Sequence, residues 1–317
     1  MPPISLTRPP ILPADLQDRG LRRRLTNDLR GAIGRGEMAV HYQPRIFLGD
    51  GRLAGAEALL RWQHPLHGAI PPSVFIPLAE ASDLILRLGG WVLRQATAEA
   101  AGWPPESGTI SVNVSGRQLE TGLISAQVAA ALADSGLPPS RLELELTESL
   151  SVEDSPETRA LLRALRAEGV SLSLDDFGTG YGSLARLRRM PFTALKLDRS
   201  FLRDVPGEQE DVAILRSVQD LATALGIRLV AEGVEQEAQH QFLRQIGCIE
   251  AQGWLFGRPV PAEVLRRRWE GAIPRIGPLA GSADGPIQPG ACPSPVSTLA
   301  GLPSSEPASP ASPLPAH

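Results

Sequence analysis

Acidic and amide side chains recur along this chain, at or near the ends of short apolar runs. They are Glu57, Asn113, Glu145, Glu148, Asp175, Asp176, Asp198, Glu232, Glu235 and Gln252, with Lys196 among them. Their oxygen atoms suit hard divalent cations better than they suit zinc or copper. Packing so many carboxylates together without metal would cost free energy through like-charge repulsion and desolvation. The pattern therefore predicts a site for two divalent ions, Mg²⁺ or Mn²⁺.

Each of these residues also has an ordinary structural explanation. An acid at a strand end commonly caps a helix or forms a surface ion pair. The pair Asp175-Asp176, followed by Phe177-Gly178, is also typical of a turn. The recurrence of polar residues after seven successive strands is what favours one shared site.

The apolar runs themselves are short and often β-branched, which is typical of buried strands in a parallel sheet. The predicted strands are Val40–Gln43, Ala54–Arg61, Thr109–Val114, Leu142–Leu146, Val170–Leu174, Ala194–Leu197, Arg228–Ala231 and Cys248–Gly253. Amphipathic stretches between them predict helices over Leu84–Ala101, Ile124–Ser135, Pro156–Glu168, Asp211–Leu225 and Ala238–Gly247. Glycines stand where these helices should end, at Gly136, Gly169, Gly226 and Gly247.

Eight strands with helical crossovers predict an α/β fold. A (βα)₈ barrel fits them better than an open, doubly wound sheet, because no glycine-rich phosphate loop follows the first strand. In a barrel, the C-terminal ends of the strands meet at one mouth, where active sites are built. The polar residues listed above are therefore expected to converge there.

The composition divides the chain of 317 residues into three parts. Residues 1–18 are rich in proline and are expected to be a disordered leader. Residues 19–273 form the expected catalytic domain, which is close to the length that a barrel needs. Residues 274–317 are mostly Pro, Ala, Ser and Gly, and we expect a disordered tail because such a segment buries little apolar area.

Charge and cysteine content point to a cytoplasmic protein. A formal net charge of −4 argues against broad binding to a nucleic-acid polymer or an anionic membrane. Two cysteines do not make a disulfide scaffold, which favours a reducing compartment. We find no apolar run long enough for a membrane span, and the basic cluster near the N-terminus follows the apolar stretch, unlike a signal peptide.

The motifs around these residues resemble the EAL domain family over roughly residues 22–270. The matching blocks, in chain order, are His41-Tyr42-Gln43-Pro44, Glu57-Ala58-Leu59-Leu60-Arg61-Trp62, Asn113-Val114-Ser115, Glu145-Leu146-Thr147-Glu148-Ser149, Asp175-Asp176-Phe177-Gly178-Thr179-Gly180-Tyr181, Lys196-Leu197-Asp198, Ala231-Glu232-Gly233-Val234-Glu235 and Gln252-Gly253-Trp254. Eight ordered blocks at the family's spacing leave little room for chance. Trp254 stands where the family commonly has Tyr or Phe, and Gly182 stands where it more often has a side chain.

The resemblance implies a modified TIM barrel whose first strand is antiparallel, and hydrolysis of cyclic di-GMP to linear pGpG. It implies one metal ion on Glu57, Asn113, Glu145 and Asp175, and a second that shares Asp175 and adds Asp176. Glu232 is expected as general base or as a direct or water-mediated ligand, two roles that the sequence does not separate. Lys196 is expected to position the attacking water or to neutralise a phosphoryl oxygen.

Substrate contacts are expected from Arg61, as a clamp on the phosphate that is not cut, and from Gln43, Glu235 and Gln252. Glu148 is expected to order the loop at 175–183, which the family uses for substrate binding, metal capture and dimerisation, so a homodimer is left open. Two other classes of function remain as alternatives. One is a receptor that binds cyclic di-GMP without cleaving it, although no expected ligand is missing. The other is a protein-interaction module that uses the proline-rich tail.

Overall fold

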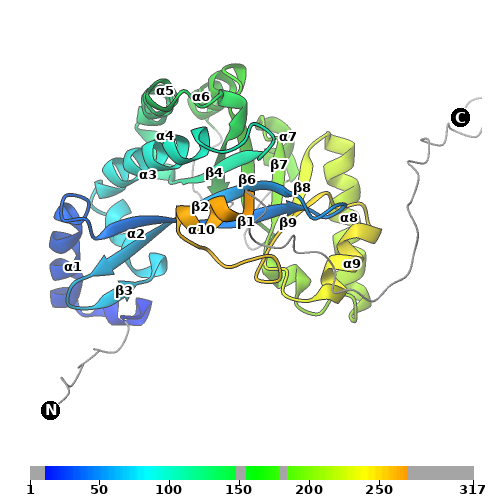
Figure 1. The fold of residues 1–317 in the computed structure, drawn as a ribbon, viewed down its shortest axis with the longest axis horizontal. Helices are drawn as coiled ribbons and strands as arrows, with labels where there is room; N and C mark the ends of the chain where they lie inside the picture. Colours follow the sequence, from blue (N-terminus) through cyan, green and yellow to red (C-terminus); the bar gives the residue numbers. More distant parts are fainter. Residues whose placement is uncertain (1–10, 148–154, 179–183, 270–317) are drawn as a thin grey trace, which may run out of the picture. The chain divides into compact units, whose positions relative to one another are not determined.

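Eight strands close into a barrel in the computed structural model, which describes residues 11–147, 155–178 and 184–269 (Figure 1). The strands are β1 (Met38–Phe47), β2 (Leu53–His64), β4 (Thr109–Val114), β5 (Leu142–Thr147), β6 (Ser171–Phe177), β7 (Ala194–Leu197), β8 (Arg228–Ala231) and β9 (Glu250–Gln252). They are hydrogen-bonded in the order β1-β9-β8-β7-β6-β5-β4-β2, and β1 pairs again with β2. The short strand β3 (Gly68–Ile70) pairs only with the outer part of β2. All eight predicted strands are therefore present.

The first strand runs against all the others, as expected. A short turn joins β1 to β2, and a hairpin connection makes its two strands antiparallel. The hairpin places Gln43 opposite Glu57 and Arg45 opposite Gly55. On its other side β1 pairs antiparallel with β9, where Arg45 lies opposite Gln252. The remaining barrel pairings are parallel.

Helices connect the parallel strands and pack against them. They are α1 (Arg19–Gly31), α2 (Pro72–Glu80), α3 (Leu84–Ala101), α4 (Gly116–Glu120), α5 (Leu123–Ser135), α6 (Pro156–Ala167), α7 (Leu184–Arg189), α8 (Gln209–Leu225), α9 (Glu237–Gln245) and α10 (Ala262–Trp269), with 3-10 turns η1 (Pro13–Gln17), η2 (Pro139–Arg141) and η3 (Arg199–Leu202). All five predicted helices are present. Gly136 and Gly226 end α5 and α8 in the left-handed conformation, at φ of 70° and 66°.

The apolar side chains form two clusters. The larger one joins the barrel strands to the surrounding helices. The smaller one lies around α1 and α2 and includes Leu25, Leu29, Phe75 and Trp62. This second cluster was not anticipated, because α1 is dominated by arginine and α2 contains Pro72 and Pro77.

Residues 11–18 correct the expected boundary of the leader. Pro13–Gln17 form η1, and Ile11 is buried in the smaller apolar cluster. Asp18 then accepts hydrogen bonds from the backbone N–H groups of Gly20 and Leu21, so it caps α1. This part of the chain was mistaken for a disordered leader because its apolar residues are few and are interrupted by prolines.

The inside of the barrel is polar at the end away from the mouth. There, two arginines and two glutamates form a ring of ion pairs among β1, β5, β8 and β9. The members are Arg45, Glu143, Arg228 and Glu250. Each charge contacts two partners of opposite sign, so the cluster, hereafter the basal ion ring, is neutral as a whole. Alternation along the strands places Gln43, Glu145 and Gln252 two residues from ring members, on the same face and toward the mouth.

No helix among the described residues is both long and apolar enough to cross a membrane.

Candidate functional site

Lys196 occupies the centre of an acidic cluster at the mouth of the barrel. Its Nζ lies 2.6 Å from Glu232, 2.7 Å from Glu145, 3.2 Å from Asp175 and 3.9 Å from Glu57. These acids lie on β2, β5 and β6 and directly after β8, and the side chain of Lys196 is 1% exposed. A compact ammonium with three donors suits this position because its partners approach from several directions.

A second set of contacts links Glu57 to its neighbours across the mouth. The amide of Asn113 donates a hydrogen bond to Glu57 Oε1 at 2.7 Å, and the amide of Gln252 donates to Glu57 Oε2 at 2.6 Å. The Gln252 amide also lies 3.1 Å from Gln43 Oε1, and Gln43 in turn donates to the carbonyl of Gly257 at 3.2 Å. The hairpin explains this arrangement, since it places Gln43 opposite Glu57.

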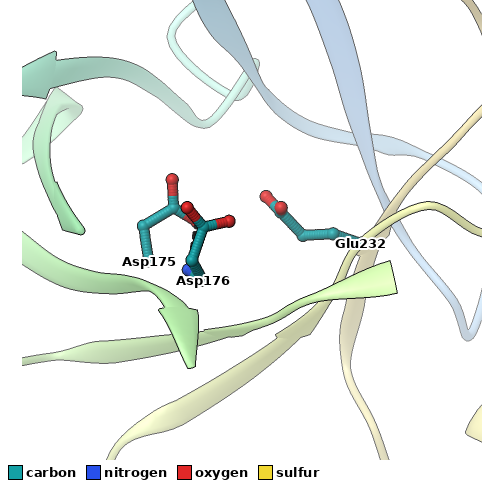
Figure 2. A group of neighbouring side chains, drawn as sticks. All are labelled: Asp175, Asp176 and Glu232. Atoms are coloured by element: carbon teal, nitrogen blue, oxygen red, sulfur yellow. Dashed lines mark hydrogen bonds between the residues drawn. The ribbon is translucent and has the colours of Figure 1, made fainter. Parts of the chain in front are cut away.

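Asp175 and Asp176 both reach the mouth because β6 is irregular at its end. The pairing with β7 passes from Leu174 to Phe177 while β7 advances only from Leu195 to Leu197, which is a β-bulge. Asp176 has a φ of 55°, a left-handed conformation that is uncommon outside glycine. Figure 2 shows the carboxylates of both residues facing that of Glu232. One oxygen from each of the three lies within 4.8 Å of the others.

The carboxylates of the cluster outnumber the positive charge beside them, which is that of Lys196, and several of their pKa values are shifted. Burial, helped by the nearby Asp175 and Glu57 and opposed by Lys196, raises the pKa of Glu232 to about 8. Burial likewise raises the pKa of Glu145 well above its ordinary value, and burial with the nearby Asp175 raises that of Asp176. For Glu57, burial is outweighed by Lys196 and by the hydrogen bonds from Gln252 and Asn113, so its pKa is lowered.

The donor set fits hard divalent cations. Oxygen Oε1 of Glu145 is buried and has no hydrogen-bond partner in the described structure, although Oε2 contacts Lys196. A buried carboxylate oxygen without a partner is costly, and a metal ion would satisfy it. Asp175, Asp176 and Glu232 add oxygens close enough to share an ion. The structure thus brings the nominated ligands Glu57, Asn113, Glu145, Asp175 and Asp176 together at the mouth, and their binding of metal stays a prediction.

The expected substrate residues are placed differently from one another. Arg61 is half-buried at the mouth, and its Nη1 donates to the backbone carbonyl of Leu60. Glu235 is exposed, and within the described residues its side chain forms no hydrogen bond or ion pair with the cluster. Asp198 caps η3 by accepting from the N–H of Ser200 and takes no part in the cluster. Glu148 lies outside the described residues.

A cavity of about 370 Å³ opens beside Glu57 and Asn113. Its lining is mainly aliphatic, from Leu60, Ile76 and Leu88, with Arg61 among the lining side chains. This cavity was not predicted from the sequence, because its walls combine residues of β2, β4 and β5 with residues of α2, α3 and α4, which lie far apart along the chain. A planar, largely apolar group next to the acidic cluster is the kind of ligand that such a space accepts.

A sequence signal for the central cation was also overlooked. Lys196 is the single lysine of the chain, beside 30 arginines. All other Lys or Arg positions are arginine, so the single lysine indicates a position where a guanidinium would not fit. The packing around Nζ gives the physical reason.

The comparisons with known proteins agree on one family. The model of the EAL domain matches residues 26–259. The bifunctional diguanylate cyclase/cyclic di-GMP phosphodiesterase MucR of Pseudomonas aeruginosa is 43% identical over 245 residues, which are 76% of this chain and 36% of MucR. The cyclic di-GMP phosphodiesterase NbdA of the same organism is 43% identical over 247 residues, 76% of this chain and 31% of NbdA. The chain thus spans about a third of the length of these relatives.

Solved structures share the fold. A structure of the PaMucR phosphodiesterase in a c-di-GMP complex has a TM-score of 0.72 and 43% identity, covering 76% of this chain and 99% of that one. The EAL domain of Mycobacterium smegmatis DcpA has a TM-score of 0.64 and 36% identity, covering 74% of this chain and 96% of that one. The barrel with its antiparallel first strand, the ordered motifs and these matches together show that the chain belongs to the EAL domain family.

Proposed function

We propose that this chain is a metal-dependent phosphodiesterase that hydrolyses cyclic di-GMP to linear pGpG. The observation that carries the proposal is the acidic cluster around Lys196, in which Glu145 keeps a buried oxygen without a hydrogen bond. The substrate is supported by the cavity beside the cluster and by the activity named for MucR and NbdA.

The residues that would hold two divalent ions are Glu57, Asn113, Glu145, Asp175 and Asp176. Such ions supply a water of lowered pKa and neutralise the phosphoryl oxygens. Lys196 holds the buried carboxylates together and keeps one positive charge beside the reacting phosphate. Gln252 and Asn113 hold Glu57 in place through the two hydrogen bonds to its carboxylate.

Glu232 is our choice for the general base. Burial and the neighbouring carboxylates keep its proton up to a pH of about 8, and added positive charge in the cluster would release it. The ionised carboxylate then accepts a proton from the attacking water. The oxygen of that water bonds to phosphorus, one ring P–O bond breaks, and a proton returns to the leaving ribose oxygen to give pGpG.

Arg61 is proposed to bind the second phosphate, the one that is not cut. It lines the cavity beside Glu57, and a guanidinium binds phosphate through two parallel hydrogen bonds. Gln43 and Gln252 offer amide groups on the β1 and β9 side of the cluster. Glu235 stays a proposed substrate contact, because its exposed side chain is near the mouth only through its place after β8.

A cytoplasmic location is also proposed. It is supported by Cys248, a buried cysteine that forms no disulfide. Homodimer formation is a separate proposal, and light scattering of the purified chain would test it.

The decisive experiment incubates the purified chain with cyclic di-GMP and either Mg²⁺, Mn²⁺ or EDTA, with the products separated by chromatography. We expect pGpG to accumulate with metal, to stop with EDTA and to resume when metal is restored. Titration of the metal-free protein with Mn²⁺ by calorimetry gives a readout independent of turnover. Full turnover without metal would refute the proposed metal dependence. Tight binding of intact cyclic di-GMP without cleavage would favour a receptor instead.

A further inference from the structure

The turn that follows β9 exposes a tryptophan beside an arginine. Trp254 is 52% exposed, whereas Phe256 in the same turn is 1% exposed. The guanidinium carbon of Arg258 lies 4.0 Å from the centroid of the Trp254 ring, a close cation–π contact. Arg258 is itself exposed, and no carboxylate pairs with it in the described part of the chain. Its positive charge is therefore available to an anionic ligand.

The turn is fastened to the acidic cluster. The carbonyl of Gly257 accepts a hydrogen bond from Gln43, and Gln43 is linked through Gln252 to Glu57. On its other side, the N–H of Leu255 donates to the carbonyl of Val234 at 3.0 Å. Val234 comes two residues after Glu232. The turn is therefore hydrogen-bonded both to β1, through Gln43, and to the segment that follows β8, through Val234.

The turn has little freedom to move away from this position. A Cβ at Gly253 would come within 2.1 Å of the carbonyl oxygen of Val234, so only glycine lets the two backbones approach this closely. Phe256 anchors the turn in the larger apolar cluster. Trp254 and Arg258 are therefore held on a rigid support at the rim, which favours a binding role.

We infer that Trp254 and Arg258 form a stacking platform for one guanine base of the substrate, and this inference rests on the proposed function. The cavity lined by Leu60 and Ile76 lies on the β2 and β4 side of the acidic cluster, whereas Trp254 follows β9 on the other side of β1. A cyclic dinucleotide has two bases joined by two phosphates. One base enters the cavity, the second stacks on Trp254, and the phosphates lie between them at the cluster.

The chemistry of the pair matches a purine next to a phosphate. Every base presents a π face that stacks on an aromatic ring, and tryptophan offers the largest such surface. Arg258 covers one face of the ring and keeps its charge near the phosphate that joins the bases. Trp254 and Arg258 thus act in substrate binding and take no part in proton transfer or metal binding.

The test compares the wild-type chain with Trp254→Ala, Trp254→Phe and a matched control, Ile249→Ala. Ile249 is 55% exposed and precedes β9, at the end away from the mouth. We expect Trp254→Ala to raise KM for cyclic di-GMP by about 5- to 100-fold, because base stacking on an aromatic ring contributes that much to binding. Trp254→Phe should restore most of the affinity, kcat should change little in both, and Ile249→Ala should match wild type.

A fluorescence titration with pGpG provides the second readout, since it needs no hydrolysis. Binding should quench the emission of wild type, and the change should be absent from Trp254→Phe. An unchanged KM for Trp254→Ala together with the same quenching in Trp254→Phe would overturn the platform while leaving the proposed function intact. Quenching that depends on Trp254 in a protein that does not cleave cyclic di-GMP would support the platform and refute the proposed activity.

Discussion

The ammonium of Lys196 lies 2.6 Å from Glu232 and thereby joins the proposed base to the proposed metal ligands. The same nitrogen contacts Glu145 at 2.7 Å, so one buried cation serves carboxylates from β5 and from the end of β8. A single positive charge does not balance the acids around it. Burial raises the pKa values of Glu145 and Glu232, and the surplus of negative charge adds to this effect. Divalent ions would neutralise that surplus.

Replacing Lys196 by arginine should be as harmful as removing the charge. The planar guanidinium cannot point its donors at carboxylates that surround one nitrogen at 2.6 to 3.9 Å. We expect kcat for Lys196→Arg and Lys196→Met to fall by about 10²- to 10³-fold, the scale of losing one preorganised electrostatic contact. Steady-state kinetics with saturating Mn²⁺ would measure this. If Lys196→Arg kept more than a tenth of wild-type kcat, net charge alone would be the requirement.

Glu57 and Arg61 should separate chemistry from binding. Glu57→Ala should abolish kcat, because it removes a ligand from the proposed metal site, where the ions supply the nucleophile. Its calorimetric affinity for Mn²⁺ should fall as well. Glu57→Gln keeps the side-chain volume and one acceptor for the Gln252 amide but loses the charge, so it tests whether the charge is what matters. Near-normal kcat with a raised KM in Glu57→Ala would show that the site is misassigned.

Arg61→Ala should mainly raise KM, because a clamp on the phosphate that is not cut binds ground state and transition state alike. We expect about a 10- to 100-fold increase, the scale of a hydrogen bond to a charged group. Arg87→Ala, at an exposed position on α3, is the matched control and should leave both constants unchanged. A fall in kcat of Arg61→Ala at unchanged KM would place Arg61 in the chemical step instead.

The basal ion ring predicts a stability that depends on pH. Burial alone would raise the pKa of Glu143, but Arg45 and Arg228 outweigh it and lower the pKa to about 2. A lowered carboxyl pKa contributes stability above the ordinary value of 4.5 and loses it as the pH falls toward 2. The difference between the two pKa values of Glu143, 4.5 and about 2, corresponds to roughly 3 kcal/mol in the free energy of unfolding.

Urea unfolding of wild type and Glu143→Gln would measure this contribution. At pH 7 the variant should be the less stable protein. The difference in the free energy of unfolding between the two proteins should narrow as the pH is lowered from 5 to 3. Glu168→Gln changes an exposed glutamate at the end of α6 and should show no such narrowing. A gap that stays constant down to pH 3 would mean that Glu143 acts through its shape and not its charge.

The composition of residues 275–317 predicts that they are dispensable for folding and catalysis. A truncation after Ala272 should keep the melting temperature and most of the activity, since a segment rich in Pro, Ala, Ser and Gly has little apolar area to bury. Calorimetry and the pGpG assay would measure both. A large loss of either would show that these residues pack on the barrel or contribute to the site.

Most of the barrel could be predicted from the sequence because its strands are short, apolar and bounded by clear turn residues. β4, β7 and β8 have the predicted ends, as does α3. The elements that escaped prediction have mixed signals: α1 carries Leu21, Leu25 and Leu29 at helical spacing among many arginines, and α2 has a proline in its interior. Their stability comes from the smaller apolar cluster, in which α1 and α2 pack together with Trp62 of β2, and the local sequence does not reveal this packing.

The candidate site could also be predicted only in part from the sequence. The positions of Glu57, Glu145, Asp175 and Glu232 on the predicted strands indicated that these residues would meet, because the C-terminal ends of parallel strands lie at one mouth of a barrel. The bulge that turns both Asp175 and Asp176 toward Glu232 was not predicted, since a bulge depends on the pairing with the neighbouring strand. The aliphatic cavity was not predicted either, because its lining residues come from three strands and three helices that lie far apart in the sequence.

The burial of the one lysine bears on how the protein can be handled. Reagents that couple to amines have a single side-chain target, and that amine is 1% exposed. Such reagents should therefore leave the mouth of the folded barrel untouched. A lysine-specific protease has likewise one cleavage site, next to Lys196 in the middle of β7. The rate at which it cuts would report directly on how often the barrel opens.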